Sequence, residues 1–232
     1  MRILLINPST PSFISNKEFN VPLNMLYLGA VLKKAQHNVV LLDLNIYRWR
    51  QGIDSPELYD TIMTDAVARH RPQLIGIGCP FSGNILEVLQ VACTIKRFTK
   101  TVPIVIGGIH PTLFPEEILM HNSCIDWIII GEGESSLVSL VATIEGGDYA
   151  FETIDGFAYR VRGKIVVNPK RSFIANLDEI PFQDYDLINV KEYYHDTSEW
   201  HNPRNLSINA SLPIITSRSC PMRCSFCSNF KV

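Results

Sequence analysis

Leu74-Ile75-Gly76-Ile77-Gly78 is an unbroken apolar run that ends in the loop Cys79-Pro80-Phe81-Ser82-Gly83. A run without polar alternation is typical of a strand that is buried on both faces of a parallel sheet. Four more runs of this kind lie upstream and downstream, at positions 2–7, 39–43, 104–106 and 127–130. The sequence therefore predicts five buried strands.

Apolar residues at helical spacing lie between these runs. The first stripe consists of Leu23, Leu26, Tyr27, Ala30 and Val31. Ser55-Pro56-Glu57 has the N-cap signature of a second helix, further stripes lie at 85–95 and 137–144, and Pro115 begins a short helix. Strands that alternate with helices predict an α/β fold, here a flavodoxin-like, doubly wound, five-stranded parallel sheet with helices on both faces.

Ligands of such sheets bind beyond the carboxyl ends of the strands. Four loops are expected there, and three of them contain glycine, which lets a backbone approach a ligand closely. They are Asn7-Pro8-Ser9-Thr10, Cys79-Pro80-Phe81-Ser82-Gly83, Gly107-Gly108-Ile109-His110-Pro111-Thr112 and Gly131-Glu132-Gly133-Glu134-Ser135. A tight turn explains the glycines of any one loop better than a ligand does, but the set as a whole favours a ligand site.

The pattern changes after Gly147. Residues 157–161 and 164–167, separated by Arg162-Gly163, predict a β-hairpin. Residues 168–211 are polar and irregular but retain aromatic residues, which indicates a packed linker, and residues 212–217 predict a new strand. The predicted division is an α/β domain at 1–147, a hairpin and linker at 148–211, and the start of a further domain at 212–232.

Composition and charge exclude several classes of protein. The chain is 46% hydrophobic and 19% charged, which suits a globular core. Its net charge of −2, without long runs of one sign, gives no electrostatic case for binding nucleic acid or an anionic membrane. The apolar start at residues 1–7 is too short for a signal peptide or a membrane span. We expect a soluble, cytoplasmic protein with no nucleic-acid and no membrane partner.

Three cysteines, Cys220, Cys224 and Cys227, lie close together directly after the predicted strand 212–217. Thiolates are the usual ligands of iron–sulfur clusters, and a cubane normally takes four of them. Three ligands on one loop leave one iron open, and an open position distinguishes a catalytic metal centre from a structural one. A zinc site would need a fourth ligand, and the nearest upstream histidines, His195 and His201, lie across a proline-containing linker. The spacing therefore predicts a 4Fe-4S cluster.

The other three cysteines, Cys79, Cys93 and Cys124, are scattered along the chain. Six cysteines in a chain of this length are too few for a disulfide scaffold. We therefore interpret these three as small buried apolar side chains.

The spacing Cys-x-x-x-Cys-x-x-Cys, with the aromatic Phe226 before the last cysteine, resembles the signature of radical S-adenosylmethionine enzymes. The resemblance implies that the open iron binds S-adenosylmethionine. One electron from the reduced cluster would cleave this cofactor to methionine and a 5′-deoxyadenosyl radical, which abstracts hydrogen from the substrate. Such chemistry belongs to the cofactors, while the protein orients them and excludes water and oxygen.

The upstream region resembles the cobalamin-binding domain of the subgroup of these enzymes that carries that vitamin. The resemblance rests on Gly-Gly-x-His-Pro-Thr from Gly107, Gly-Glu-Gly-Glu from Gly131, Pro22-Leu23, and Leu177-Asp178-Glu179-Ile180-Pro181-Phe182. It extends from Met1 to the last cysteine. It makes residues 1–147 a cobalamin-binding domain and residues 212–232 the first strand and cluster loop of a radical S-adenosylmethionine barrel.

The resemblance also implies a set of cobalamin contacts at the strand ends, where the nucleotide tail would lie. These are Pro8, Ser9, Thr10, Pro80, Phe81, Ser82, Gly107, Gly108, His110, Pro111, Thr112, Gly131, Glu132, Gly133 and Glu134. Classical cobalamin mutase domains supply a histidine to cobalt from an Asp-x-His-x-x-Gly loop, but the loop after the first strand here has none. We expect no protein histidine as the lower axial ligand, and a structural or tail-binding role for His110.

The chain resembles an N-terminal fragment, because a full eight-unit barrel needs about 250 residues and residues 212–232 supply only its start. The resemblance implies a cobalamin-dependent radical S-adenosylmethionine methyltransferase acting on an unactivated carbon or phosphorus. Cyclisation, rearrangement and ring contraction remain open. We expect the fragment to bind cobalamin without turnover, and the parent protein to use a small-molecule or peptide substrate and a reductant such as flavodoxin or ferredoxin.

Two alternative functions remain at this stage. A radical methylthiotransferase would bind a second cluster through three cysteines of its α/β domain, and the positions of Cys79, Cys93 and Cys124 argue against that. A non-catalytic cobalamin sensor or carrier is the other alternative. A flavodoxin-like receiver is excluded, because Asn7 and Cys79 stand where its acidic residues would be.

Overall fold

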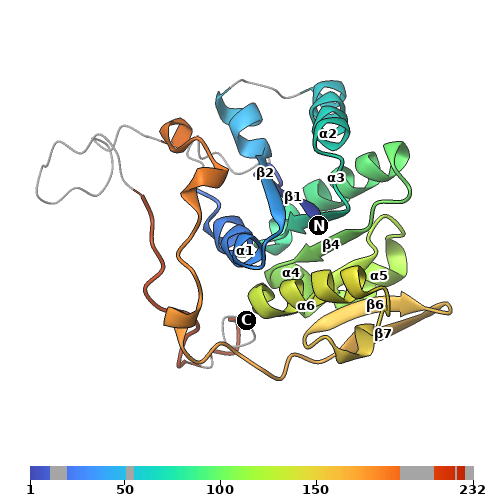
Figure 1. Cartoon of the computed structure of the whole chain (residues 1–232), viewed down its shortest axis with the longest axis vertical. Coiled ribbons are helices and arrows are strands. Elements are labelled where there is room, and N and C mark those ends of the chain that lie inside the picture. Colours follow the sequence, from blue (N-terminus) through green and yellow to red (C-terminus); the bar gives the residue numbers. More distant parts are fainter. Residues whose placement is uncertain (11–19, 51–54, 194–211, 223, 228–232) are drawn as a thin grey trace, which may run out of the picture.

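The computed structural model describes residues 1–10, 20–50, 55–193, 212–222 and 224–227 (Figure 1). Its strands are β1 Arg2–Asn7, β2 Asn38–Asp43, β3 Leu74–Gly78, β4 Ile104–Gly107, β5 Trp127–Ile129, β6 Phe157–Val161 and β7 Lys164–Asn168. Its α-helices are α1 Leu23–Lys34, α2 Pro56–His70, α3 Ile85–Phe98, α4 Ile109–Leu113, α5 Pro115–His121 and α6 Gly133–Gly146. The predicted strands of the sheet and the predicted helices are all confirmed, and the five-residue α4 is an addition.

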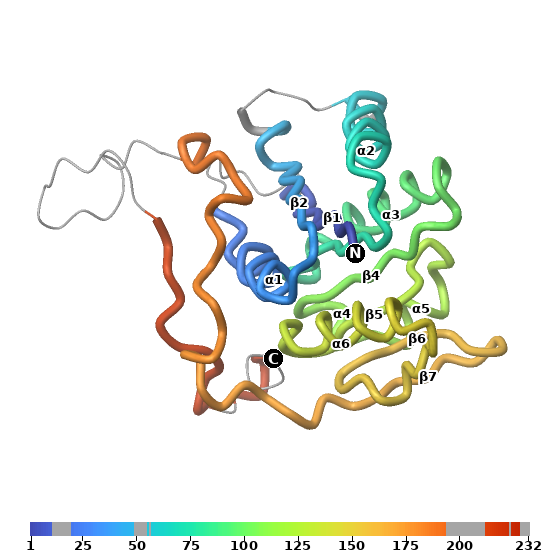
Figure 2. The backbone as a smooth tube through the Cα atoms, viewed as in Figure 1, coloured from blue at the N-terminus to red at the C-terminus, as the bar shows by residue number. Residues whose placement is uncertain are grey.

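The strands form one sheet in the order β2-β1-β3-β4-β5-β6-β7 (Figure 2). The first five strands are parallel, in the order that is typical of flavodoxin-like sheets, so the doubly wound fold is confirmed. The sheet has two more strands than predicted, because the hairpin β6–β7 continues it: β6 pairs antiparallel with β5 and β7 with β6. Pairing covers the edge of β5, which would otherwise expose a row of unpaired backbone groups.

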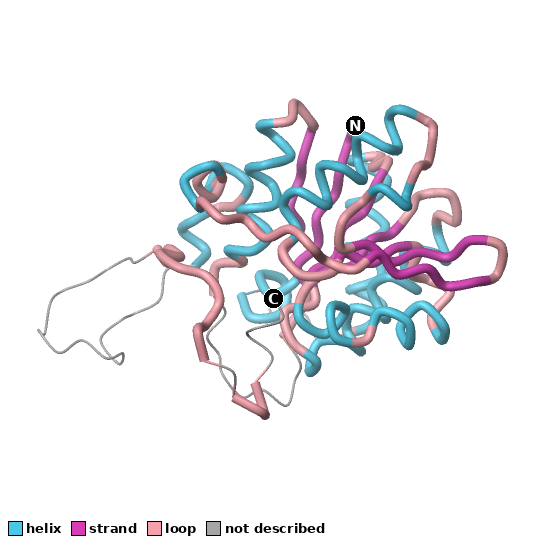
Figure 3. The backbone as a smooth tube through the Cα atoms, turned by 90° about the horizontal axis from the view of Figure 1, so that it is seen from below, coloured by secondary structure: helices cyan, strands magenta, loops and turns pink. Residues whose placement is uncertain are grey.

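Helices lie on both faces of the sheet (Figure 3), and each face has a hydrophobic core. Helices α2, α3 and α5 cover one face, through Met63, Val88 and Leu119 among others. Helices α1 and α6 cover the other face, through Met25 and Leu140 among others. Successive side chains of a strand point to opposite faces, so each buried strand contributes alternate residues to each core.

The predicted strand at 212–217 is wrong, because this segment has no regular secondary structure. Its apolar side chains are exposed, with Ile214 68% exposed. No strand of the described residues pairs with it, and an extended segment without a partner has no ladder of hydrogen bonds to stabilise it.

The interpretation of Cys93 and Cys124 as free buried side chains is also wrong. They form a disulfide between α3 and the loop before β5, with their Cα atoms 5.0 Å apart. They are 31 residues apart in the sequence, and only the packing of α3 against the sheet brings them together. Cys79 is free and fully buried, as expected.

A buried polar cluster joins the first two strands to the distant Tyr193. Oδ1 of Asp43 accepts hydrogen bonds from Nδ2 of Asn7 at 2.9 Å and from the backbone N–H of Asn45 at 3.0 Å. Oδ2 accepts from the Tyr193 hydroxyl at 2.6 Å. Asn45 in turn accepts from the backbone N–H of Thr10 at 2.7 Å, so the cluster fixes Thr10. Burial raises the pKa of Asp43 above its ordinary value, although these hydrogen bonds oppose the shift.

We expect Asp43→Asn to change the pH dependence of stability. Because the native pKa of Asp43 is raised, the native state binds this proton more tightly than the unfolded state does. The contribution of the Asp43 carboxyl to the free energy of unfolding is fully present below about pH 3.8, the ordinary pKa, and is lost as the pH rises through the raised native pKa. The free energy of unfolding of the wild type relative to Asp43→Asn should therefore fall over this window, as measured by urea unfolding at a series of pH values.

The exposed Asp65 of α2 provides the matched control, since Asp65→Asn removes a carboxylate without touching the cluster. If the difference between the wild type and Asp43→Asn stays constant with pH, or rises with it, the raised pKa is contradicted.

Candidate functional site

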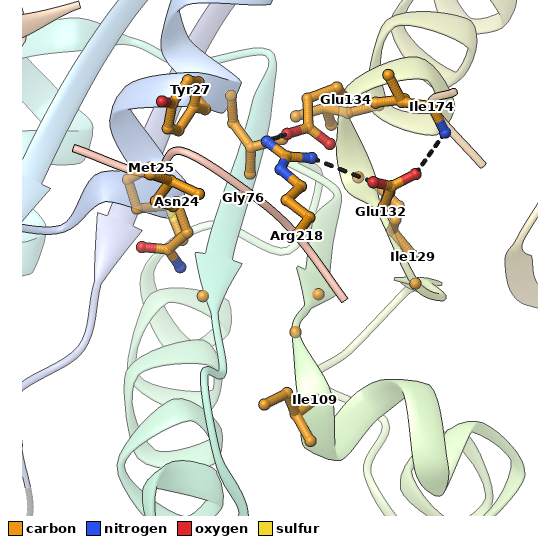
Figure 4. A pocket seen from close by; sticks show the side chains of 18 of the residues that line it. Asn24, Met25, Tyr27, Gly76, Ile109, Ile129, Glu132, Glu134, Ile174 and Arg218 are labelled. Atoms are coloured by element: carbon orange, nitrogen blue, oxygen red, sulfur yellow. Dashed lines mark hydrogen bonds and ion pairs between the residues drawn. The ribbon is translucent and has the colours of Figure 1, made fainter. Parts of the chain in front are cut away.

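A cavity of about 1030 Å3 lies between the sheet and the helices α1 and α6 (Figure 4). Its floor consists of residues of β1, β3, β4 and β5, and its walls are α1 and the loop that begins α6. Residues 173–177 of the linker and residues 215–219 line its remaining side. The volume is at the upper end of the range for small-molecule and cofactor sites, roughly 300 to 1,000 Å3.

Three strand glycines, Gly76, Gly78 and Gly107, create the floor of this cavity. The register places Gly76 beside Leu5 and Val105, and Gly78 beside Gly107. Because alternate residues of a strand share a face, all of these positions face α1 and α6. The floor therefore lacks three side chains on two adjacent strands: Leu5 and Met25 approach the positions at Gly76 and Gly78, whereas the space at Gly107 remains open.

A Cβ atom added to each of the three glycines would contact a different neighbour. A Cβ on Gly76 would lie 2.9 Å from Cδ2 of Leu5, and one on Gly78 would collide with the end of the Met25 side chain. A Cβ on Gly107 would lie 3.7 Å from Ile129, which is an ordinary van der Waals contact. A side chain at Gly107 is thus tolerated by the fold and reduces the cavity.

The loop between β5 and α6 forms one end of the cavity. Gly131 has φ of +71°, and its N–H donates to Oγ1 of Thr112 at 2.9 Å. Thr112 also donates to the carbonyl of Gly108 at 2.8 Å, which ties the loop after β4 to the loop after β5. Gly108 has φ of +126°, and a Cβ there would overlap the backbone of Cys79, so only glycine fits. The two predicted glycine loops are therefore held together beside the cavity.

The side chain of Arg218, in the segment 212–222, contacts this loop. Its guanidinium donates to Oε1 of Glu134 at 2.5 Å and to Oε1 of Glu132 at 3.4 Å. It also lies 5.5 Å from the ring centroid of Tyr27 in α1, a cation–π distance. Burial by itself would lower the pKa of Arg218, but the hydrogen bonds and charges of the two glutamates outweigh it and the pKa is raised.

Only part of the predicted contact set lines the cavity. Gly107, Gly108, Gly131, Glu132, Gly133 and Glu134 line it. Pro8, Ser9, Thr10, Pro80, Phe81, Ser82, His110, Pro111 and Thr112 do not.

The predicted residues outside the cavity have structural contacts. Thr10 is bound to Asn45. Nδ1 of His110 lies 2.9 Å from Oγ of Ser82, and the His110 ring lies 5.0 Å from that of Phe114. Burial lowers the pKa of His110, although the charge of Glu117 opposes the shift. His110 thus joins the loop after β4 to Ser82 of the loop after β3.

Several cavity residues were not predicted. They are Asn24, Met25, Tyr27 and Leu28 of α1, the floor glycines Gly76 and Gly78, residues 173–175 and Leu177, and residues 215–219. Glycine inside a strand often marks the close approach of a ligand, so the glycines of β3 carried a usable signal. The remaining residues come from segments whose packing is not visible in the sequence.

The three cysteines of the motif are free and partly buried, on a loop that follows Arg218. The backbone N–H of Cys227 donates to the carbonyl of Cys224 at 3.1 Å, so this end of the loop forms a turn. In the described part of the chain no group of three or more histidine, cysteine or acidic side chains is arranged to hold a metal ion. The donors suit an iron–sulfur cluster, but the structure does not gather the three thiols. His195 and His201 lie outside the described residues.

The cysteines of the α/β domain do not form a second site. Cys79 lies at the carboxyl end of β3, whereas Cys93 and Cys124 are bonded to each other. Burial and the charge of Glu87 raise the pKa of the Cys79 thiol to about 12, so it stays protonated at neutral pH. Three thiolates are thus not available together in this domain.

Residues 15–141 match the model of the B12 binding domain. The chain belongs to this family. The match includes α1, the floor glycines and the start of α6, whereas Leu5 and the cavity residues of 173–177 and 215–219 lie outside it. This match confirms the predicted cobalamin-binding family of the domain.

Two curated relatives match nearly the whole chain. An uncharacterised methyltransferase of Pyrococcus horikoshii is 30% identical over 99% of this chain and 45% of its own length. An anaerobic magnesium-protoporphyrin IX monomethyl ester cyclase of Synechocystis is 30% identical over 98% of this chain and 42% of its own length. The chain thus spans less than half the length of these relatives.

Two solved structures share the fold. The cobalamin-dependent S-adenosylmethionine radical enzyme OxsB, with aqua-cobalamin and S-adenosylmethionine bound, matches with a TM-score of 0.64 and 18% identity over 80% of this chain and 24% of its own. The radical S-adenosylmethionine methyltransferase TsrM of Kitasatospora setae, with cobalamin and a 4Fe-4S cluster bound, matches with a TM-score of 0.61 and 20% identity over 85% of this chain and 33% of its own.

We expect Gly107→Val to weaken cobalamin binding while preserving the fold. Valine suits a strand and its Cβ would make ordinary contacts at this position, while its side chain would enter the floor of the cavity. Affinity measured by absorbance titration should fall at least about tenfold, which corresponds to roughly 1.4 kcal/mol. Gly146→Val, at the exposed end of α6, makes the same change away from the cavity and should bind like the wild type. Equal affinity of Gly107→Val and the wild type would place the ligand elsewhere.

Proposed function

We propose that this chain binds cobalamin in the cavity between α1 and α6 and carries a 4Fe-4S cluster on Cys220, Cys224 and Cys227. It would serve as the cobalamin-binding and cluster-bearing part of a cobalamin-dependent radical S-adenosylmethionine enzyme. One observation carries the proposal: the segment that lines the open side of the cavity, residues 215–219, leads directly into the cysteine motif. The sites of the two cofactors are therefore adjacent.

The reaction that we propose is methyl transfer to an unactivated carbon or to phosphorus. When bound, the cluster supplies the electron that cleaves S-adenosylmethionine to a radical, and cobalamin carries the methyl group. The relative from Pyrococcus horikoshii is named a methyltransferase, which supports this class. The relative from Synechocystis is named a cyclase, so cyclisation is the second candidate.

The residues of the chain would bind and shield the cofactors. The floor glycines would accept the nucleotide tail of cobalamin against bare backbone. The first turn of α6 at Gly133 presents backbone N–H groups that suit phosphate or ribose oxygens. Ile174 and Leu177 line the side of the cavity away from the sheet, where apolar side chains exclude water. Three cysteine ligands would leave one iron open for S-adenosylmethionine.

The arrangement of the cysteines opposes a methylthiotransferase. A second cluster in the α/β domain would need three thiolates, and here Cys93 and Cys124 are joined while Cys79 is buried apart from them. A cobalamin sensor or carrier would need no cysteine motif beside the cavity. The enzyme is therefore the function that the site supports best.

The substrate, the reductant and the location belong to the same proposal. We propose a small-molecule or peptide substrate, an electron donor such as flavodoxin or ferredoxin, no nucleic-acid or membrane partner, and a cytoplasmic location. In the described residues, no helix has the length and apolar character needed to cross a bilayer.

We expect the chain to bind cobalamin in a one-to-one complex with a base-off absorption spectrum. No histidine among the described residues lines the cavity, and His110 is bound to Ser82 outside it. The test is an anaerobic titration with hydroxocobalamin, followed by gel filtration to remove free ligand. His110→Ala should leave the spectrum unchanged. A base-on spectrum that His110→Ala converts to base-off would identify His110 as the cobalt ligand and contradict the proposal.

We expect replacement of any one motif cysteine to abolish the cluster. After anaerobic reconstitution the wild type should hold about four irons, and Cys220→Ala, Cys224→Ala and Cys227→Ala should each lose the cluster absorption. Cys79→Ala is the matched control, because its thiol is buried and protonated. Loss of iron in Cys79→Ala alone would place the cluster in the α/β domain.

A further inference from the structure

Three segments that are far apart in the sequence meet at the guanidinium of Arg218 (Figure 4). Tyr27 comes from α1, Glu132 and Glu134 come from the start of α6, and Arg218 precedes Cys220 by two residues. The contact thus links both walls of the cavity to the loop that carries the cysteines.

The ion pairs of Arg218 differ from a typical surface pair. The side chains of Glu132 and Glu134 are only 12% and 9% exposed, and that of Arg218 is 22% exposed. Exposed ion pairs contribute little, because solvent screens them and the side chains lose entropy. A guanidinium that is shielded from solvent and shared by two carboxylates is held in a defined direction, because its donors form a rigid fork.

Glu132 is itself fixed by other contacts. Its Oε2 accepts from the backbone N–H of Ile174 at 2.7 Å, and its backbone carbonyl accepts from Nζ of Lys170 at 3.0 Å. Lys170 also donates to Ser136 of α6 at 3.1 Å. The carboxylate that receives Arg218 is therefore part of the rigid α6 end of the domain and does not swing freely.

The segment around Arg218 has few other attachments. Residues 212–217 form no ladder and are exposed. The Tyr185 hydroxyl donates to the carbonyl of Pro213 at 2.7 Å, five residues before Arg218. Between that point and the cysteines, Arg218 ties the described part of the segment to the loop before α6.

We propose that Arg218 is a positioning residue, whose pairs with Glu132 and Glu134 set where the cysteine loop stands relative to the cavity. The inference rests on the proposed function and adds to it a fixed separation between cluster and cobalamin. Two cofactors that act on one substrate need such a geometry, since a misplacement of about 1 Å can cost roughly a hundredfold in rate.

The test compares Arg218→Met, Arg218→Lys and the wild type without turnover. The intact protein is reconstituted anaerobically with its cluster and cob(II)alamin, the cluster is reduced, and the magnetic interaction between the two paramagnetic centres is measured by electron paramagnetic resonance. The wild type should show one defined magnetic interaction between the reduced cluster and cob(II)alamin. Arg218→Met should lose it while retaining iron and cobalamin, Arg218→Lys should restore it in part, and Glu134→Gln should weaken it.

Arg97→Met is the matched control. Arg97 pairs with Asp60 at 2.8 Å on the face of the sheet opposite the cavity, with its side chain 64% exposed. The interaction in this variant should match that of the wild type. An unchanged interaction in Arg218→Met would overturn the proposal.

A cofactor-free measurement separates this proposal from the proposed function. Hydrogen exchange of the amides at 212–222 should be faster in Arg218→Met than in the wild type and Arg97→Met. If neither cofactor binds to the wild type, the proposed function fails. The hydrogen-exchange result still shows whether Arg218 holds the segment 212–222 in place. Equal exchange in all three proteins would overturn it.

Discussion

The glycines on one face of β3 and β4 are the constraint on which the site depends: Gly76 and Gly78 let Leu5 and Met25 lie close to the sheet, and Gly107 leaves open space. Gly76, Gly78 and Gly107 lie on adjacent strands and face the same pair of helices. Beside them Leu5, Val105 and Ile129 belong to the core under α1 and α6 and also line the cavity. Because protein interiors are close-packed, a gap of this size persists only where the sequence withholds side chains and the helices are supported elsewhere.

That support comes from both ends of the domain. On one side Asp43 binds Asn7, Asn45 and Tyr193, and Asn45 binds Thr10, which does not line the cavity. On the other side Lys170 and Ile174 bind Glu132, and Arg218 binds Glu134, at the start of α6. The same short loop therefore closes the cavity and receives the segment that leads to the cysteines.

The sequence was sufficient for the sheet, the helices and the glycine loops, because uninterrupted apolar runs and helical stripes are local signals. The hairpin's place in the sheet, the Cys93–Cys124 disulfide and the role of Arg218 depend on contacts between distant segments. The strand predicted at 212–217 failed for a related reason: its composition suits a strand, but a strand also needs a neighbour. Gly76 and Gly78 were visible as strand glycines, yet their shared face follows only from the register.

The central claim is that the glycine floor receives cobalamin, and a crystal structure of the protein with cob(II)alamin tests it most directly. The account predicts the nucleotide tail between α1 and α6, against Gly76, Gly78 and Gly107, with no histidine on cobalt. Cobalamin bound outside the cavity, or coordinated by His110, would contradict it.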